Sequence, residues 1–184
     1  MNKRILLLTG NPGVGKTTVL LKVVDALKAR GYSVGGMISR EVRSSGERVG
    51  FEILDLSSNK RGWLAHVNQP DGPRVGKYRV NLNDLEGIGV NAILKAVEEC
   101  DVVAIDEIGP MELFSERFKE AVKRAVESGK LVIGVIHWKA RDRLMEEVKK
   151  REDGGIIEVT LENRNKQQET VVEKAVEFLE SQRK

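Results

Sequence analysis

Apolar and polar positions follow two different periods along this 184-residue chain, and segments with one period alternate with segments with the other. Short, nearly continuous apolar runs are typical of strands buried on both faces, whereas apolar residues spaced three and four apart are typical of helices packed on a sheet. The first helical stripe consists of Leu20, Val23, Val24 and Leu27. The pattern predicts strands over residues 5–8, 34–39, 102–105, 131–136 and 156–160, and further helices over 82–99, 113–128, 140–149 and a closing stretch that ends at Gln182.

Residues 41–80 interrupt this alternation. Three short β segments, separated by turns rich in Ser, Gly, Asn and Pro, are predicted there at 49–54, 62–67 and 75–80. Alternating strands and helices indicate an α/β fold with a mainly parallel sheet, helices on both faces and right-handed crossovers. We expect the insertion at 41–80 to be antiparallel and to extend one side of that sheet. No linker, repeat or low-complexity tract divides the sequence, which predicts a single domain over residues 1–184.

A glycine-rich segment between the first strand and the first helix matches the phosphate-binding pattern G-x-x-x-x-G-K-[ST]. Its glycines allow backbone N–H groups to converge on phosphate oxygens, and the helix N-terminus adds partial positive charge. Lys16 is expected to reach the β- and γ-phosphates, and the Thr17 hydroxyl to bind Mg²⁺. The alternative is a glycine-rich turn with a solvated lysine. The predicted nucleotide-binding residues are Gly10, Asn11, Pro12, Gly13, Val14, Gly15, Lys16, Thr17 and Thr18.

A second predicted part of this site is an apolar strand that ends in two carboxylates. Asp106 has the position of a Walker B aspartate, which holds Mg²⁺ opposite Thr17. Glu107 would point away from Asp106 if the strand continues, and could then polarise a water for attack on the γ-phosphate. Acidic residues also follow strands simply to face solvent. The binding segment predicted here comprises Val102, Val103, Ala104, Ile105, Asp106, Glu107, Ile108 and Gly109.

Four other polar residues are candidates for roles in the same site. His137 ends the strand at 131–136 and could sense the γ-phosphate, although a lone histidine at a strand end is more often a local hydrogen-bond partner. Arg164, after the last strand, could contact the base or the phosphates, and Lys77 and Arg79 could reach the site from the insertion. Solvated surface charge is the alternative for each cation.

Composition narrows the class of protein. The 31 basic and 28 acidic residues leave a charge of +3, which is compatible with nucleic-acid binding but does not indicate it. A single cysteine, Cys100, suits a reducing compartment, and no apolar run is long enough to span a bilayer. We therefore expect a cytoplasmic protein that has no membrane partner and is a monomer or weak oligomer.

Five segments occur in an order that resembles the cancer-related nucleoside-triphosphatase family, first described in thermophiles. They are Gly10–Thr17, Arg48–Phe51, Val75–Tyr78, Asp106–Leu113 and Thr160–Arg164, and the resemblance covers essentially the whole chain. It implies a RecA-like P-loop fold and slow, Mg²⁺-dependent hydrolysis of several nucleoside triphosphates. Two departures stand out: many relatives have lysine at the position of Pro110, and many have aspartate at the position of Asn165.

The leading functional hypothesis is Mg²⁺-dependent hydrolysis of ATP, GTP, CTP, UTP and their deoxy forms to diphosphate and phosphate. Catalysis would rest on Lys16, Glu107 and His137. A nucleoside or nucleotide kinase is an alternative, but the candidate lid arginines Arg141, Arg143 and Arg151 lie in a helix-like stretch. A second alternative is a nucleotide-gated RNA- or protein-binding switch. A translation-type GTPase is disfavoured because the base-reading motif [NT]-K-x-D does not occur.

Overall fold

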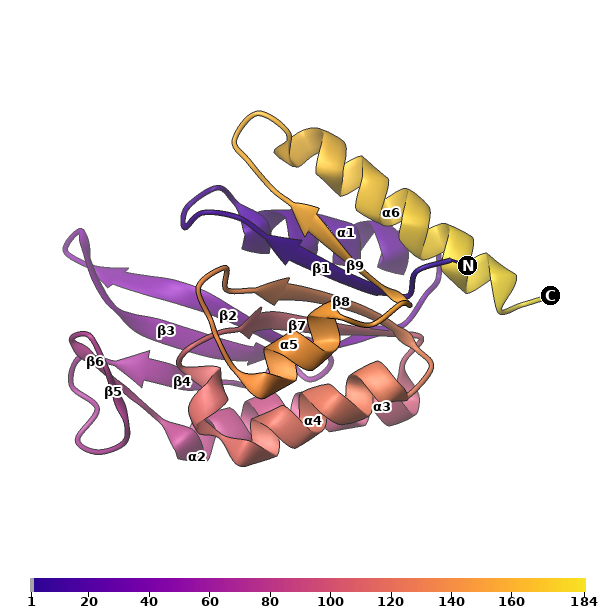
Figure 1. The fold of residues 1–184 in the computed structure, drawn as a ribbon. Coiled ribbons are helices and arrows are strands. Elements are labelled where there is room, and N and C mark those ends of the chain that lie inside the picture. The colour runs from indigo at the N-terminus through magenta and orange to yellow at the C-terminus, as the bar shows by residue number, and fades with distance from the viewer. Residues whose placement is uncertain (1) are drawn as a thin grey trace.

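The computed structural model describes residues 2–184, which fold around one nine-stranded sheet (Figure 1). The sheet order is β5-β6-β4-β3-β2-β7-β8-β1-β9. The strands are β1 (Ile5–Thr9), β2 (Val34–Ser44), β3 (Glu47–Asp55), β4 (Arg61–His66), β5 (Arg74–Val75), β6 (Tyr78–Val80), β7 (Val102–Ile108), β8 (Leu131–Ile136) and β9 (Gly154–Glu158).

The five strands β2, β7, β8, β1 and β9 are parallel and form the core of the sheet. The side chains of β8 and nearly all of those of β1 are buried, which explains their continuous apolar sequences. Strands β3, β4, β6 and β5 continue the sheet beyond β2 in antiparallel order. The predicted mainly parallel α/β sheet with an antiparallel extension is therefore confirmed. We call β3–β6, with the outer half of β2, the wing.

Helices cover both faces of the core sheet (Figure 1). On one face, α1 (Lys16–Ala29) packs beside α6 (Arg164–Ser181) over a cluster that includes Leu8, Leu20 and Ile133. The other face is covered by α2 (Leu82–Asp84), the π-helix η1 (Leu85–Val90), α3 (Asn91–Glu99), the 3₁₀ turn η2 (Glu112–Phe114), α4 (Glu116–Glu127) and α5 (Arg143–Lys149). None of the helices in the described part of the chain is both long and apolar enough to cross a membrane.

Several predicted boundaries were wrong for identifiable reasons. The strand predicted over 34–39 runs on to Ser44, because its polar continuation pairs with β3 on the exposed wing. The segment predicted over 75–80 is instead a tight hairpin, since Gly76 adopts a positive φ of 58° and Val75 pairs with Tyr78.

Two predicted helices also begin later than expected. The helix predicted from residue 140 starts at Arg143, where Asp142 accepts a hydrogen bond from the Leu144 N–H. The three arginines Arg141, Arg143 and Arg151 were predicted to lie in a helix-like stretch. Only Arg143 lies in α5, because Arg141 precedes the helix and Arg151 follows it. The helix predicted from residue 113 opens with η2 and starts again after Ser115, which caps α4.

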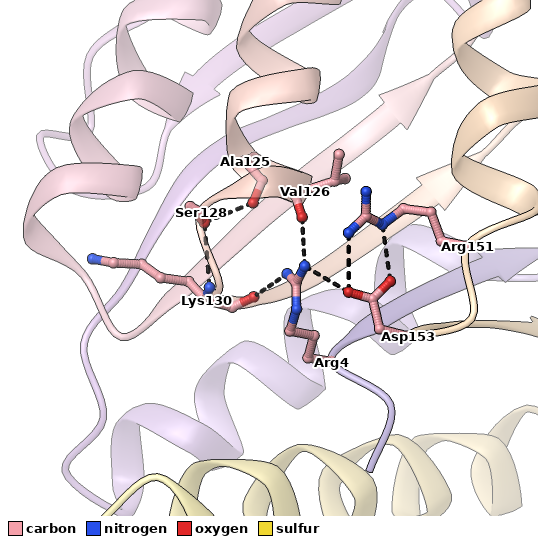
Figure 2. A network of polar contacts seen from close by, with 7 residues as sticks. All are labelled: Arg4, Ala125, Val126, Ser128, Lys130, Arg151 and Asp153. Carbon is pink, nitrogen blue, oxygen red and sulfur yellow. Dashed lines mark hydrogen bonds and ion pairs between the residues drawn. The ribbon is translucent and has the colours of Figure 1, made fainter. Parts of the chain in front are cut away.

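A polar network closes the end of the core at which the parallel strands begin (Figure 2). The Arg4 guanidinium, just before β1, donates to the carbonyls of Val126 and Lys130 at 2.7 and 3.1 Å and pairs with Asp153 at 2.6 Å. Arg151 also binds Asp153, at 2.9 Å. One half-buried cation thus joins the C-terminus of α4 to the starts of β1, β8 and β9, the strands whose opposite ends carry the candidate site.

Candidate active site

The glycine-rich loop lies at the carboxyl edge of the sheet, between β1 and α1. Gly10 has a φ of +150°, and a Cβ there would lie 2.3 Å from the Val159 carbonyl oxygen, so only glycine fits against the strand end. Gly13 and Gly15 also have positive φ values, of 80° and 97°. Gly15 immediately precedes α1, and its carbonyl accepts from the Val19 N–H at 2.9 Å. The loop therefore places the N-terminus of α1 at the carboxyl edge of the sheet, a geometry that suits the binding of an anion.

The Lys16 side chain lies over this loop. Its Nζ donates hydrogen bonds to the Gly10 and Asn11 carbonyls at 2.8 and 2.9 Å. Burial lowers the pKa of Lys16, and the nearby carboxylates of Glu107 and Asp106 partly oppose that effect. The structure thus brings the predicted phosphate-binding cation and both predicted carboxylates together.

Asp106 is a buried carboxylate with an unused oxygen. Its side chain is 2% exposed, and its Oδ2 has no hydrogen-bond partner among residues 2–184. Burial raises the pKa of Asp106 to about 7, hydrogen bonding from the Thr17 side chain lowers it, Glu107 raises it and Lys16 lowers it. A buried carboxylate oxygen without a partner is costly, so Oδ2 is suited to a cation or a cation-bound water.

Glu107 follows Asp106 but does not continue the regular ladder. The pairing of β7 with β8 shifts register between Asp106 and Ile108, and Glu107 is the extra residue of this bulge. The expectation that it would point away from Asp106 as the next residue of a regular strand therefore does not apply. Burial raises the pKa of Glu107, and the Lys16 ammonium lowers it. The half-buried Glu107 carboxylate and the Lys16 ammonium are therefore close enough to act on each other's pKa.

Glu112 is a further acid near this site, and no role for it was predicted. It lies at the start of η2 and is 2% exposed. Its pKa is raised well above the usual range, first by burial and then by Glu107, with a smaller contribution from Asp106; the N–H groups of Glu112 and Gly109 oppose the shift. The sequence contains only one signal for it, its place in the Asp106–Leu113 motif, because an acid in a polar turn normally faces water.

His137 directly follows β8, the strand that separates β1 from β7, as expected for a γ-phosphate sensor. Its Nδ1 accepts a hydrogen bond from the Lys139 N–H at 3.2 Å. The pKa of His137 is lowered by burial and then by the cations Lys16 and Lys139. A neutral ring that accepts at Nδ1 carries its proton at Nε2. The local hydrogen-bond role is therefore present, and the sensor role stays a prediction.

The three candidate cations divide into two groups. Arg164 begins α6, and its Nη1 would lie 3.6 Å from a Cβ on Gly15, so it adjoins the glycine-rich loop. In contrast, the contacts of Lys77 and Arg79 are within the wing: Lys77 lies 5.5 Å from the Tyr78 ring centre, and Arg79 donates to the Gly72 carbonyl at 2.9 Å. Their described contacts stabilise the β5–β6 hairpin and do not support a role at the loop.

Comparison with known proteins agrees with this geometry. Residues 5–172 match the family model described as NTPase. The chain is 48% identical over 166 residues to nucleoside-triphosphatase THEP1 of Thermofilum pendens, covering 90% of this chain and 91% of the relative. The chain belongs to the NTPase family. THEP1 of Methanopyrus kandleri is 43% identical over 95% of this chain and 97% of its own.

Two solved structures of NTPase relatives share the fold. The crystal structure of THEP1 from Aquifex aeolicus matches with a TM-score of 0.80 and 31% identity, over 90% of this chain and 95% of that one. The solution structure of a human cancer-related nucleoside triphosphatase matches with a TM-score of 0.78 and 38% identity, over 92% and 95%. The family resemblance and the P-loop NTPase fold predicted from the sequence are confirmed.

Two of the five segments that carried the family resemblance meet in the wing of this NTPase. Arg48 donates from Nε to the Tyr78 hydroxyl at 2.8 Å, and its guanidinium lies 5.1 Å from the Phe51 ring centre. Phe51 and Tyr78 also pack edge to face at 5.3 Å. These motifs therefore hold the wing together, whereas the glycine-rich loop, the end of β7 and the start of α6 form the site.

Proposed function

We propose that this protein hydrolyses nucleoside triphosphates to nucleoside diphosphates and phosphate in a Mg²⁺-dependent reaction. One observation carries the proposal: the buried Asp106 carboxylate, whose Oδ2 has no hydrogen-bond partner among residues 2–184, lies beside Thr17 and Lys16 at the glycine-rich loop. The membership of the NTPase family and the names of its relatives support the reaction class.

The residues present fit Mg²⁺. This cation prefers oxygen ligands and is usually held by one or two carboxylates together with substrate phosphates. Here the buried Asp106 Oδ2 and the adjoining Thr17 hydroxyl would hold it, Asp106 through a water. When bound, the cation would neutralise charge on the phosphate oxygens.

The remaining chemistry falls to the chain's own groups. The amides of the loop and Lys16 would bind the β- and γ-phosphates, which requires the Lys16 ammonium to leave the Gly10 and Asn11 carbonyls. Glu107 would accept a proton from the attacking water, a role that suits a carboxylate whose pKa is raised by burial. His137, neutral and protonated at Nε2, would donate a hydrogen bond to the γ-phosphate.

Base tolerance is part of the proposal. Arg164 adjoins Gly15, and a guanidinium can contact phosphates or stack on any base. No base-reading motif accompanies it in the sequence. We therefore expect ATP, GTP, CTP, UTP and their deoxy forms to be hydrolysed at rates of the same order.

The decisive experiment compares the parent with Glu107→Gln and, as matched control, Glu120→Gln on the exposed side of α4. Glu107→Gln should bind a fluorescent nucleotide normally and lose about 10²- to 10⁴-fold in kcat, the usual contribution of a general base. The control should behave like the parent. Following labelled γ-phosphate with and without an added nucleoside tests the kinase alternative, because a hydrolase delivers the label to water. Turnover that survives excess chelator would contradict the Mg²⁺ requirement.

A further inference from the structure

We propose that a surface pocket between η2 and the segment before α5 binds single-stranded nucleic acid. Bases stack on the exposed rings of Phe114 and Trp138, and phosphates pair with Lys139 and Arg141. The pocket encloses about 340 Å³, a volume within the range of small-ligand sites. This binding goes beyond the hydrolysis of nucleoside triphosphates and requires neither Mg²⁺ nor a general base.

The pocket is separate from the glycine-rich loop. Its walls come from the segment after β7, which includes Pro110 and Phe114, and from residues 139–142 after β8. The helix α5, which follows the second wall, covers the sheet face opposite to α1 and α6 (Figure 1). None of the residues proposed to hold the triphosphate or the metal lines the pocket. The two sites therefore use different side chains.

The charges of the pocket favour an anionic ligand. Lys139 and Arg141 line it, both are exposed, and neither pairs with an acid among residues 2–184. The acid of the lining, Asp142, is already used: it accepts from the Lys119 ammonium at 2.8 Å and from the Leu144 N–H at 2.9 Å. The lining therefore carries two uncompensated cations, which suit phosphate groups.

Two exposed aromatic rings accompany these cations. Phe114 lines the pocket and is 48% exposed, and Trp138, which directly precedes the lining residue Lys139, is 47% exposed. The Lys139 Nζ lies 4.6 Å from the Trp138 ring centre, so the cation and the ring are presented together. Exposed apolar groups that gather at one place mark interaction sites. Proteins that bind single strands combine a positively charged groove with aromatic rings on which bases stack.

A single strand matches this combination better than other anions do. A duplex keeps its bases stacked inside, where the rings of Phe114 and Trp138 cannot reach their faces. An acidic peptide would pair with the cations, but its carboxylates supply no flat apolar surface for the rings. A strand supplies successive bases for rings on two separate segments, joined by the phosphates that the cations need. Because every base has such a face, we expect little preference for sequence.

Fluorescence anisotropy with a labelled single-stranded RNA of roughly ten nucleotides tests the proposal, without nucleoside triphosphate or Mg²⁺. Phe114→Ala and Trp138→Ala should each weaken binding about tenfold or more, because each removes a ring on which a base stacks. Lys139→Gln combined with Arg141→Gln should also weaken binding. This double variant should reduce the slope of log affinity against log salt concentration by about 1.4, or about 0.7 per lost phosphate contact.

Matched controls lie elsewhere on the surface. Trp63→Ala removes a ring that is 36% exposed on the wing, and Lys22→Gln combined with Lys174→Gln removes the same charge from exposed positions of α1 and α6. Both controls should bind within about threefold of the parent. In a Trp63→Phe background, Trp138 is the only tryptophan of the chain, and RNA should quench its fluorescence at the concentrations that raise the anisotropy.

Four results would overturn the proposal. A parent protein that binds no single strand at low salt would remove the function, and equal losses in the pocket and control variants would place binding outside the pocket. Equal affinity for a duplex of the same sequence would show that the rings take no part. Competition by a polyglutamate peptide as effective as competition by unlabelled RNA would assign the pocket to an acidic protein instead.

Discussion

Replacing Asp106 with Asn should change how the stability of the metal-free protein depends on pH. The pKa of Asp106 rises from 3.8 in its ordinary state to about 7 in the folded protein, chiefly because the side chain is buried. An acid whose pKa is higher when folded favours the folded state while it is protonated. That contribution is therefore complete below about pH 4 and is lost as the pH rises from about 4 to 7.

The size of the effect follows from the shift. A difference of roughly three pKa units corresponds to about 4 kcal/mol at 1.36 kcal/mol per unit. Asn cannot ionise, so the free energy of unfolding of Asp106→Asn relative to the parent should rise by up to about 4 kcal/mol between pH 4 and pH 8. A buried amide N–H without an acceptor costs about 1–3 kcal/mol at every pH, which shifts the whole curve but not its slope.

Denaturant unfolding at several pH values, with a chelator present, measures this difference. Asp25→Asn on the exposed face of α1 is the matched control for removing a carboxylate at the surface. Adding Mg²⁺ and a nucleotide at pH 8 should stabilise the parent more than Asp106→Asn, since the carboxylate then has its partner. A stability difference that does not change between pH 4 and pH 8 would refute the assignment of the buried carboxylate as the cause.

Three further substitutions are predicted from the structure. Gly109→Ala should lower kcat at least about tenfold with nucleotide affinity retained, because the new methyl group meets Glu107 and Glu112 oxygens at 2.9 and 3.2 Å; kinetics and nucleotide titration check this. Arg4→Ala should cost about 1–3 kcal/mol in denaturant unfolding, because Asp153 loses one of its two half-buried partners and two carbonyls lose their donor. Gly36→Ala should yield little folded protein on purification, because its Cβ would lie 2.0 Å from the Ala104 carbonyl oxygen in β7.

Each of these has a clear opposing result. Unchanged turnover in Gly109→Ala would show that the two acids can move aside without consequence. An Arg4→Ala protein as stable as the parent would mean that water replaces the guanidinium at no cost. A stable, folded Gly36→Ala protein would require β2 and β7 to separate locally while the sheet remains intact.

The sequence predicts the parts of the molecule that depend on local spacing. The glycine-rich loop can be predicted because its chemistry needs glycines and a lysine at fixed intervals. The strand before Asp106 can be predicted from its apolar run, because β7 is buried on both faces. The antiparallel extension is also visible, through its turn residues. These features require no knowledge of which segments meet in space.

The remainder depends on contacts between distant segments. The burial of Glu112 depends on how η2 packs against β7. The proximity of Arg164 to Gly15 depends on where α6 begins after β9. The outer half of β2 is polar because it faces water on the wing, so apolar periodicity ends five residues before the strand does. The bulge at Glu107 arises from its register with β8, and no single segment encodes that.

Strand β2 is shared by the parallel core of the sheet and the antiparallel wing. Its first residues pair with β7 in the core, its later residues pair with β3, and Ile53, Leu64 and Val80 of the wing are buried in the same apolar cluster as Leu7 and Phe118. The antiparallel strands are therefore not a detachable appendage. Excising the strands would open the core to water, and we expect a single cooperative melting transition for both regions.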